Sequence, residues 1–483
     1  MEIAQPTDDL YRYDEEFRDH IATVDQKGKR IWLFPKEPGG NFHQWRVVVT
    51  IALLSIFFAG PFVRIGGRPL LLLNIFERKF VVFGQAFWPQ DFVLLAITLL
   101  TFFVFIILFT VVFGRIWCGW LCPQTLFMEM VFRKIEYWIE GDGPAQRRLD
   151  RQPPNLTKIT KKTFKHFLFL LVSVLIAFTA LAYLIGEENT LQLVQASPLE
   201  NSAAFLGLAA FTGIFYGVFA GFREQACIAV CPYGRLQGVL LTKDSIVVAY
   251  DWLRGEPRRK LKRHAAAEVK AGDCIDCLRC VHVCPTGIDI RNGTQLECVN
   301  CTACIDACDE VMARVHKPKG LIRYASYNSI QHNVAKLITP RVIGYSVVLL
   351  ALMGLLSFAL LTRSDVETNV FKVSGTLFQR SEDGFITNLY NVEFLNKTFE
   401  ELPLQIKVES PDAASLIKPD GKPISVPAGG LLKTIYFIRI PVADITSAKT
   451  IVILGVYQEG KLLQKVKVKF IGPVTQKPKN TSL

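Results

Sequence analysis

Residues 274–285 read CIDCLRCVHVCP, and residues 298–308 read CVNCTACIDAC. Each stretch has the cysteine spacing C-x2-C-x2-C-x3-C, which is typical of bacterial ferredoxin modules with cubane iron–sulfur clusters. In such modules three closely spaced cysteines of a run bind one cluster, and the fourth binds the neighbouring cluster. The spacing therefore predicts a module with two [4Fe–4S] clusters that moves single electrons.

The crossed pairing assigns four thiolates to each cluster. Cluster one is assigned to Cys274, Cys277, Cys280 and Cys308, and cluster two to Cys298, Cys301, Cys304 and Cys284. A zinc module or a disulfide frame is the alternative, but zinc needs only four ligands per site and does not require this tandem spacing. One departure is that Asp309, and not proline, follows the last cysteine. The turn signal is weaker there, and the ligand is retained.

The other four of the 12 cysteines form two C-x3-C-P motifs. They are Cys118, Cys122, Cys227 and Cys231. Pro123 and Pro232 can each begin a helix, which leaves the preceding cysteine at the N-cap, where the helix dipole favours a thiolate. Four soft sulfurs suit Cu(I), zinc or an iron–sulfur centre. Buried packing cysteines are the alternative, but packing alone rarely repeats one spacing at equivalent ends of two apolar segments.

Half of the 483 residues are hydrophobic, and many of them lie in long apolar runs. A bilayer-spanning helix needs about 20 such residues. The candidate spans are Val47–Phe62, Phe92–Phe113, Phe164–Ile185, Ala203–Phe222 and Val342–Leu361. A buried core helix could explain one of these segments, but five together predict a multi-pass membrane protein.

The basic residues predict how the chain is oriented in a cell inner membrane. Residues 114–163 and 223–341 are rich in Lys and Arg, whereas Gly186–Ser202 contains neither. Basic segments stay on the cytoplasmic side. The N-terminus and the cysteine-rich module are therefore expected in the cytoplasm, and the C-terminal region in the periplasm. The net charge of +12 follows from this bias, so no nucleic-acid partner is expected. No cleavable signal peptide is evident in residues 1–46.

Beyond residue 363 the pattern changes to short β-branched or aromatic runs separated by turns. The expected strands are Val370–Phe378, Phe385–Leu395, Leu404–Val408, Leu432–Ile438, Thr450–Val456 and Leu462–Phe470. About seven such strands predict a small β-sandwich. Two further elements are expected: a hairpin or re-entrant segment within Arg64–Asp91, and an interfacial amphipathic helix over Thr125–Ile139.

The fold class expected is a polytopic α-helical membrane protein with an inserted cytoplasmic 2[4Fe–4S] ferredoxin-like module and a C-terminal all-β sandwich. The expected parts are an N-terminal segment (1–46), a membrane domain with four transmembrane helices and both C-x3-C-P motifs (47–241), the ferredoxin module (242–341), a fifth helix (342–362) and the sandwich (363–483).

The whole pattern resembles the CcoG/FixG/RdxA family of accessory proteins for assembly of cbb3-type cytochrome c oxidase. The resemblance rests on GRIWCGWLCPQT from Gly114, REQACIAVCPYGR from Arg223, and the tandem ferredoxin runs. The stretches GKRIWLFPK from Gly28, GRPLLLLN from Gly67 and GFITNLYN from Gly384 add to it. It extends nearly end to end and implies an immunoglobulin-like fold for the C-terminal sandwich.

The resemblance implies that the protein reduces Cu(II) to Cu(I) for the copper centre of the oxidase, with copper at the four C-x3-C-P cysteines. The implied partners are a cytosolic electron donor and a copper chaperone or oxidase subunits. Two other functions remain open. One is an electron carrier between quinone and a reductase, with an extra iron centre at these cysteines. The other is an assembly scaffold without a redox role.

Overall fold

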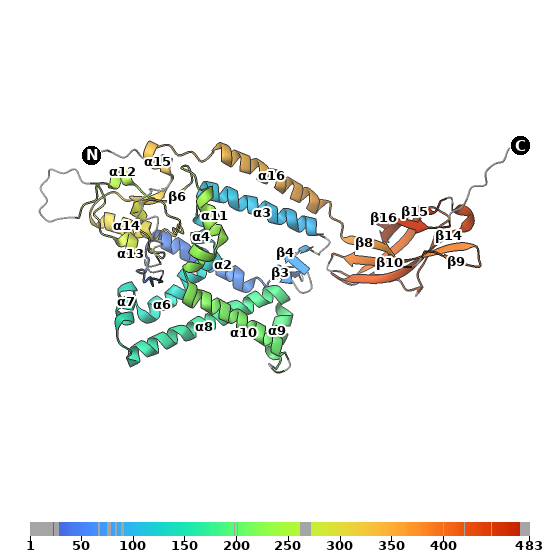
Figure 1. The fold of residues 1–483 in the computed structure, drawn as a ribbon, viewed down its shortest axis with the longest axis horizontal. Coiled ribbons are helices and arrows are strands. Elements are labelled where there is room, and N and C mark those ends of the chain that lie inside the picture. Colours follow the sequence, from blue (N-terminus) through green and yellow to red (C-terminus); the bar gives the residue numbers. More distant parts are fainter. Residues whose placement is uncertain are drawn as a thin grey trace. The chain divides into compact units, whose positions relative to one another are not determined.

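The computed structural model describes Thr23 and residues 29–473, apart from residues 66–67, 75–78, 83–84, 88–90, 198, 200, 261–271, 374, 376, 399, 420 and 446. The chain forms two compact units (Figure 1). Unit 1 contains residues 1–63 and 96–355, and unit 2 contains residues 64–95 and 356–483.

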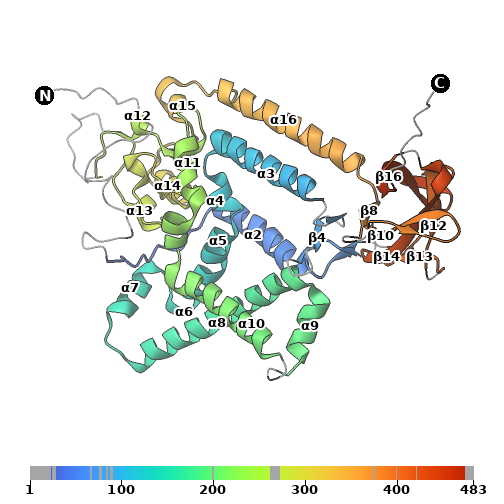
Figure 2. The ribbon, with the colours of Figure 1, turned by 45° about the vertical axis from the view of Figure 1, so that its right-hand side comes forward.

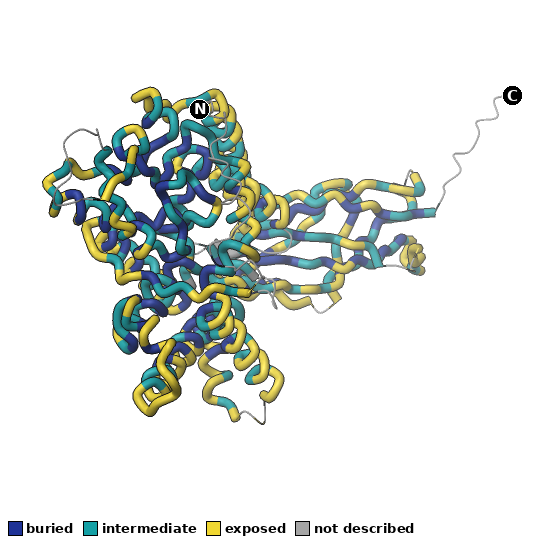
Figure 3. The backbone as a smooth tube through the Cα atoms, turned by 60° about the vertical axis from the view of Figure 1, so that its left-hand side comes forward, coloured by how far each residue is buried: buried dark blue, intermediate teal, exposed yellow. Residues whose placement is uncertain are grey.

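Among the described residues, five helices are long and apolar enough to cross a membrane. They are α2 (Asn41–Ala59), α3 (Phe92–Phe113), α8 (Leu156–Ile185), α10 (Ser202–Tyr216) with its π-helical continuation η3 (Gly217–Phe222), and α16 (Pro340–Leu361). Few of their residues are buried, and Figure 3 shows the backbone coloured by this burial; lipid-facing helices require such exposure. The five predicted spans are confirmed.

Two of these helices begin earlier than the apolar runs do. Helix α2 begins at Asn41 instead of Val47, because Asp306 accepts hydrogen bonds from the backbone N–H groups of Phe42 and His43 and so caps the helix. Helix α8 begins at Leu156 instead of Phe164. Its N-cap Asn155 accepts a hydrogen bond from the backbone N–H of Lys158. Polar caps therefore extend both helices beyond their apolar parts.

The chain after the first C-x3-C-P motif is helical but is not a surface helix. Helix α4 (Ile116–Trp120) contains Cys118, and after Cys122 the chain runs through α5 (Pro123–Leu126), η2 (Phe127–Phe132), α6 (Arg133–Glu140) and α7 (Gly143–Arg151). Phe132 and Arg133 are at most 1% exposed. The interfacial helix predicted over Thr125–Ile139 is wrong in this respect, because Arg133 and Glu136 of its charged face are buried in ion pairs within unit 1.

The remaining elements of unit 1 are mostly short. They are α9 (Glu187–Gln195), η4 (Ala226–Val230), α11 (Pro232–Leu240), β6 (Val247–Tyr250), α12 (Trp252–Gly255), α13 (Arg279–His282), η5 (Ile290–Asn292), α14 (Ala303–Arg314), β7 (Ile322–Ala325) and α15 (Tyr327–His332). Strands β6 and β7 lie before and after the cysteine-rich runs in the sequence and pair antiparallel, which brings the two ends of this module together. Figure 2 shows α13 and α14 within this module. The Asp309 carboxylate accepts a hydrogen bond from the backbone N–H of Gly320 at 2.8 Å, which gives this departure from proline a structural role.

Unit 2 begins with short strands before α3. They are β1 (Arg64–Ile65), β2 (Arg68–Pro69), β3 (Leu71–Asn74), β4 (Lys79–Val82) and β5 (Gln85–Phe87). Strand β4 pairs antiparallel with β3 and with β5, which confirms the hairpin predicted within Arg64–Asp91. Asp91 forms ion pairs with Arg363 and Lys397, so this segment is tied to the C-terminal sandwich.

The C-terminal part of unit 2 is a sandwich of two antiparallel sheets. One has the order β12-β14-β10-β8 with β9 paired to β10, and the other has the order β13-β11-β15-β16. The strands are β8 (Val366–Lys372), β9 (Gln379–Arg380), β10 (Phe385–Asn396), β11 (Leu402–Ser410), β12 (Ser415–Ile417), β13 (Ile424–Val426), β14 (Leu431–Pro441), β15 (Lys449–Gln458) and β16 (Lys461–Ile471). The short 3-10 helix η6 (Val442–Asp444) follows β14.

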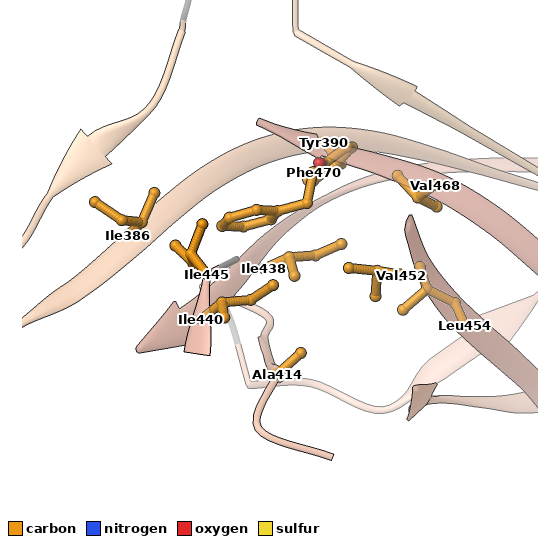
Figure 4. Packing of buried hydrophobic residues seen from close by; sticks show 10 residues of the cluster. All are labelled: Ile386, Tyr390, Ala414, Ile438, Ile440, Ile445, Val452, Leu454, Val468 and Phe470. Carbon is orange, nitrogen blue, oxygen red and sulfur yellow. The ribbon is translucent and has the colours of Figure 1, made fainter. Parts of the chain in front are cut away.

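Inward-facing side chains of both sheets form the sandwich core. Ile386, Ile438 and Phe470 are fully buried there, and Figure 4 shows them packed together. The Tyr390 hydroxyl donates a hydrogen bond to the Lys469 carbonyl across the sheets at 2.9 Å. The all-β prediction is confirmed. The first strand lies four residues earlier than expected, and β12 and β13 were not anticipated.

Candidate iron–sulfur and cysteine sites

The cysteines assigned to cluster one lie around one cavity. Cys274, Cys277, Cys280 and Cys308 line it together with apolar side chains such as Met312 and Leu321. The cavity has a volume of about 380 Å³. Cys277 is exposed, so this site has an edge at the protein surface.

The cysteines assigned to cluster two lie around a second cavity of about 340 Å³. Cys284, Cys298, Cys301 and Cys304 line it, and Cys280 lines both cavities. Burial raises the pKa of Cys298 to about 12 and that of Cys301 to about 11. Such buried thiols become thiolates when a metal replaces their protons.

The backbone of each run curls in the same way around its cavity. Asp276 and Leu278 in the first run have positive φ angles of 51° and 57°, and the equivalent residues Asn300 and Thr302 in the second run have 52° and 65°. Left-handed conformations are uncommon for residues other than glycine. Their recurrence at matching positions indicates that both loops are shaped to surround a group. The donor set and the cavities fit two [4Fe–4S] clusters.

The two C-x3-C-P motifs have the local structure that their prolines predict. Cys122 is the N-cap residue of α5 and Cys231 is the N-cap residue of α11. Pro123 and Pro232 occupy the first turns of these helices. Gly234, in the first turn of α11, lies so close to the Cys227 carbonyl that a Cβ there would be 2.7 Å from its oxygen.

The two motifs face each other. The Gln237 side-chain amide of α11 donates to the Cys118 sulfur at 3.2 Å, and the Gln124 amide of α5 donates to the Arg223 carbonyl at 3.5 Å. Arg115 also crosses between them and donates to the Gly234 carbonyl at 2.6 Å. The four cysteines therefore lie close enough to act electrostatically on one another.

The C-x3-C-P cysteines do not converge on a single atom in this structure. Among the described residues, no three His, Cys, Asp or Glu side chains converge tightly enough to hold one metal ion. The ferredoxin cysteines share this property, because ligands of a cubane surround a cluster and not a single atom. Burial raises the pKa of Cys118 to about 11 and that of Cys227 to about 12, so both are thiols until a metal binds.

The first C-x3-C-P motif packs directly on the loop of cluster two. A Cβ on Gly119 would lie 2.5 Å from the Val299 carbonyl oxygen and 2.7 Å from that of Asn300. Cys118 packs against the apolar cluster that contains Val299 and Cys301. The Trp120 indole donates to the Tyr324 hydroxyl at 3.0 Å. Cluster two is thus the one next to the C-x3-C-P cysteines.

A buried ion-pair network lies beside the second motif. Arg223 binds Glu136 at 2.6 Å, and Arg133 lies 3.4 Å from Glu224. Burial opposes ionisation of Glu136, but Arg223 and Lys165 outweigh it and hold the Glu136 pKa below its usual range. Arg133 also donates to the carbonyl of Pro285, the residue after Cys284, at 3.0 Å. The network fixes the second motif and the ferredoxin loop to each other.

Three family models match the chain. The model described as "4Fe-4S dicluster domain" matches residues 222–327, and "4Fe-4S binding domain" matches residues 95–141. A third, the "IG-like fold at C-terminal of FixG", matches residues 356–473.

Long stretches of known proteins are also similar. The nitrogen fixation protein FixG of Rhizobium meliloti (strain 1021) is 34% identical, over 80% of this chain and 81% of that protein. The chain belongs to the FixG/RdxA family. Its RdxB and RdxA members from Cereibacter sphaeroides are 36% and 35% identical, over 85% and 79% of this chain and 89% and 82% of those proteins.

The family and the helices establish the coarse function and fold class. The protein is an iron–sulfur electron-transfer protein with several helices that can span a membrane, a ferredoxin part and an immunoglobulin-like C-terminal domain. The sequence reasoning missed Gln237 and Gly119. Gln237 is a polar residue six positions after Cys231, and Gly119 lies between Cys118 and Cys122. Neither position indicates from the sequence alone which residue it contacts.

Proposed function

We propose that this protein carries single electrons from a cytosolic one-electron donor to the C-x3-C-P cysteines, where Cu(II) is reduced to Cu(I) for the copper centre of a cbb3-type oxidase. The two [4Fe–4S] groups, held by Cys274, Cys277, Cys280 and Cys308 and by Cys284, Cys298, Cys301 and Cys304, supply the one-electron chemistry. One electron added to Cu(II) gives Cu(I), and no bond is formed or broken.

The contact of Gly119 with the Val299 and Asn300 carbonyls carries the proposal. It brings the first C-x3-C-P motif against the loop of cluster two, so electrons have a short route between them. The exposed Cys277 offers a place for the donor to approach cluster one. Soft sulfurs favour Cu(I) over Cu(II), so ligand choice at these cysteines adds to the driving force for reduction.

The proposal includes the orientation of the chain in the membrane and the proteins that receive Cu(I). The basic residues in 114–163 and 223–341 favour a cytoplasmic ferredoxin module in an inner membrane. Five spanning helices then leave the immunoglobulin-like domain in the periplasm. A copper chaperone or oxidase subunits would receive Cu(I). In this proposal the chain has five functional parts: the N-terminal segment (1–46), the membrane domain (47–241), the ferredoxin module (242–341), the fifth helix (342–362) and the sandwich (363–483).

A second candidate is an iron–sulfur centre at Cys118, Cys122, Cys227 and Cys231 in a quinone-linked electron carrier. The observation that favours it is the "4Fe-4S binding domain" match to residues 95–141, which include the first motif. A scaffold without a redox role is a third possibility.

Metal analysis and copper reduction on one anaerobic preparation separate these functions. The proposal predicts about eight irons per chain, a Cu(I)-binding capacity and one-electron reduction of Cu(II). About twelve irons without copper binding would instead establish the carrier. Full oxidase maturation by a variant that lacks both clusters would establish the scaffold.

A further inference from the structure

Arg115 is a buried cation whose hydrogen-bond partners among the described residues are backbone carbonyls. It is 5% exposed. It donates to the Cys298 carbonyl at 3.1 Å, to the Leu296 carbonyl and to the Gly234 carbonyl at 2.6 Å, and its Nε has no partner. No carboxylate pairs with it among the described residues. Since a buried charge without a counter-charge is costly, an anionic group is expected next to it.

Arg46 is a second buried arginine that contacts the first C-x3-C-P motif. It is 2% exposed, donates from Nε to the Gly119 carbonyl at 3.1 Å, and leaves one terminal nitrogen without a partner. It too has no carboxylate partner within the part of the chain that the structure describes. Arg46 acts electrostatically on Cys301, and Arg115 acts on Cys298 and Cys118. Both uncompensated cations therefore border the cluster-two ligands.

Cluster one has no equivalent cations among the described residues. The arginine beside it, Arg291, is bound by two carboxylates, Asp289 at 2.6 Å and Asp276 at 2.6 Å. Arg254, on the side of Cys308, is paired with Asp273 at 2.6 Å. Arg133 near cluster two is likewise compensated by Glu129 and Glu224. Among the described residues, the buried arginines without a carboxylate partner thus border cluster two and not cluster one.

We propose that Arg46 and Arg115 raise the reduction potential of cluster two above that of cluster one, so that electrons enter at cluster one and collect at the cluster next to the C-x3-C-P cysteines. Reduction adds one negative charge to a cluster, and fixed positive charge in a buried, weakly screened place stabilises that reduced form. Both arginines lie outside the ferredoxin motif, Arg46 on helix α2 and Arg115 between α3 and α4. They therefore set the direction of electron flow, as positioning residues that contact no substrate.

The test is an EPR-monitored redox titration of the full-length protein with Arg115→Gln, Arg46→Gln and the charge-conserving Arg115→Lys. Cys284→Ser and Cys308→Ser variants assign the two signals. Arg254→Gln, which removes a half-buried and carboxylate-paired charge beside cluster one, is the matched control. The inference rests on the two-cluster part of the proposed function but not on copper, so a failed copper assay leaves it standing.

We expect each Gln variant to lower the midpoint potential of cluster two enough to change the electron equilibrium between the clusters at least tenfold, which corresponds to about 59 mV for one electron. We expect the cluster-one potential to stay unchanged. Arg115→Lys keeps the positive charge and should therefore retain most of the cluster-two potential that Arg115→Gln loses. An unshifted cluster two with full iron content, or equal shifts of both clusters, would overturn the inference. If Arg115→Gln loses iron, Arg46→Gln decides by itself, because it also removes one positive charge beside cluster two.

Discussion

The sharpest structural prediction concerns Gly119. Its replacement by alanine places a methyl group 2.5 Å from the Val299 carbonyl oxygen, whereas ordinary contact begins near 3.4 Å. The obstructing atoms belong to the backbone, so the cluster-two loop must move away by about 0.9 Å. Overpacking of this kind costs about 1–3 kcal/mol, or about 5- to 150-fold in the equilibrium between the seated and unseated loop.

The assay measures iron content and the EPR signals of both clusters. We expect Gly119→Ala to lose or broaden the cluster-two signal and to slow Cu(II) reduction, while the cluster-one signal persists. Gly207→Ala is the matched control, because a Cβ at Gly207 meets no atom within 4 Å. An unchanged cluster-two signal in Gly119→Ala would show that the loop does not rest on the C-x3-C-P motif, and the proposed electron route would lose its basis.

Three further predictions concern pairing, stability and orientation. Cys284→Ser should remove the cluster-two signal and Cys308→Ser the cluster-one signal; the reverse outcome refutes the crossed pairing. Glu136→Gln removes the closest carboxylate of buried Arg223 and should cost about 3–5 kcal/mol of stability, against about 0–1 kcal/mol for the exposed Glu310→Gln. Since the folded-state pKa of Glu136 is lowered, its stabilisation is complete above the unfolded-state pKa and is lost as the pH falls through the folded-state value. Thermal unfolding in detergent between pH 7 and acid pH measures this, and a flat difference between wild type and Glu136→Gln contradicts it. A reporter fused after Lys319 should be active in the cytoplasm and one fused at the C-terminus outside it; both on one side would remove a span.

The fold could be predicted where the sequence pattern is local. The apolar runs gave five helices, and the alternation from Phe385 and from Leu462 gave the long strands β10 and β16. Short strands such as β13 contain too few residues for a period. The burial of Arg133 was missed because a charged helix face normally indicates solvent, and only the tertiary pairing with Glu224 reverses that reading.

The candidate site could likewise be predicted only where its residues are close together in the sequence. Cysteine spacing led to the residues that line the two ferredoxin cavities, since the ligand order of such modules is local in sequence. It could not reveal that Gly119 approaches Asn300, or that no carboxylate among the described residues pairs with Arg46 or Arg115. Those features depend on residues far apart in the chain that meet only in the folded protein.

The central claim is that electrons leave the module through the C-x3-C-P cysteines to copper. A stopped-flow, single-turnover experiment tests it most directly: reduced protein with both clusters intact is mixed with one equivalent of Cu(II), and cluster reoxidation and Cu(I) formation are followed together. The account predicts that wild type couples the two events, and that Cys122→Ala combined with Cys227→Ala slows both at least tenfold while iron content stays full. Equal rates in wild type and the double variant would contradict the claim.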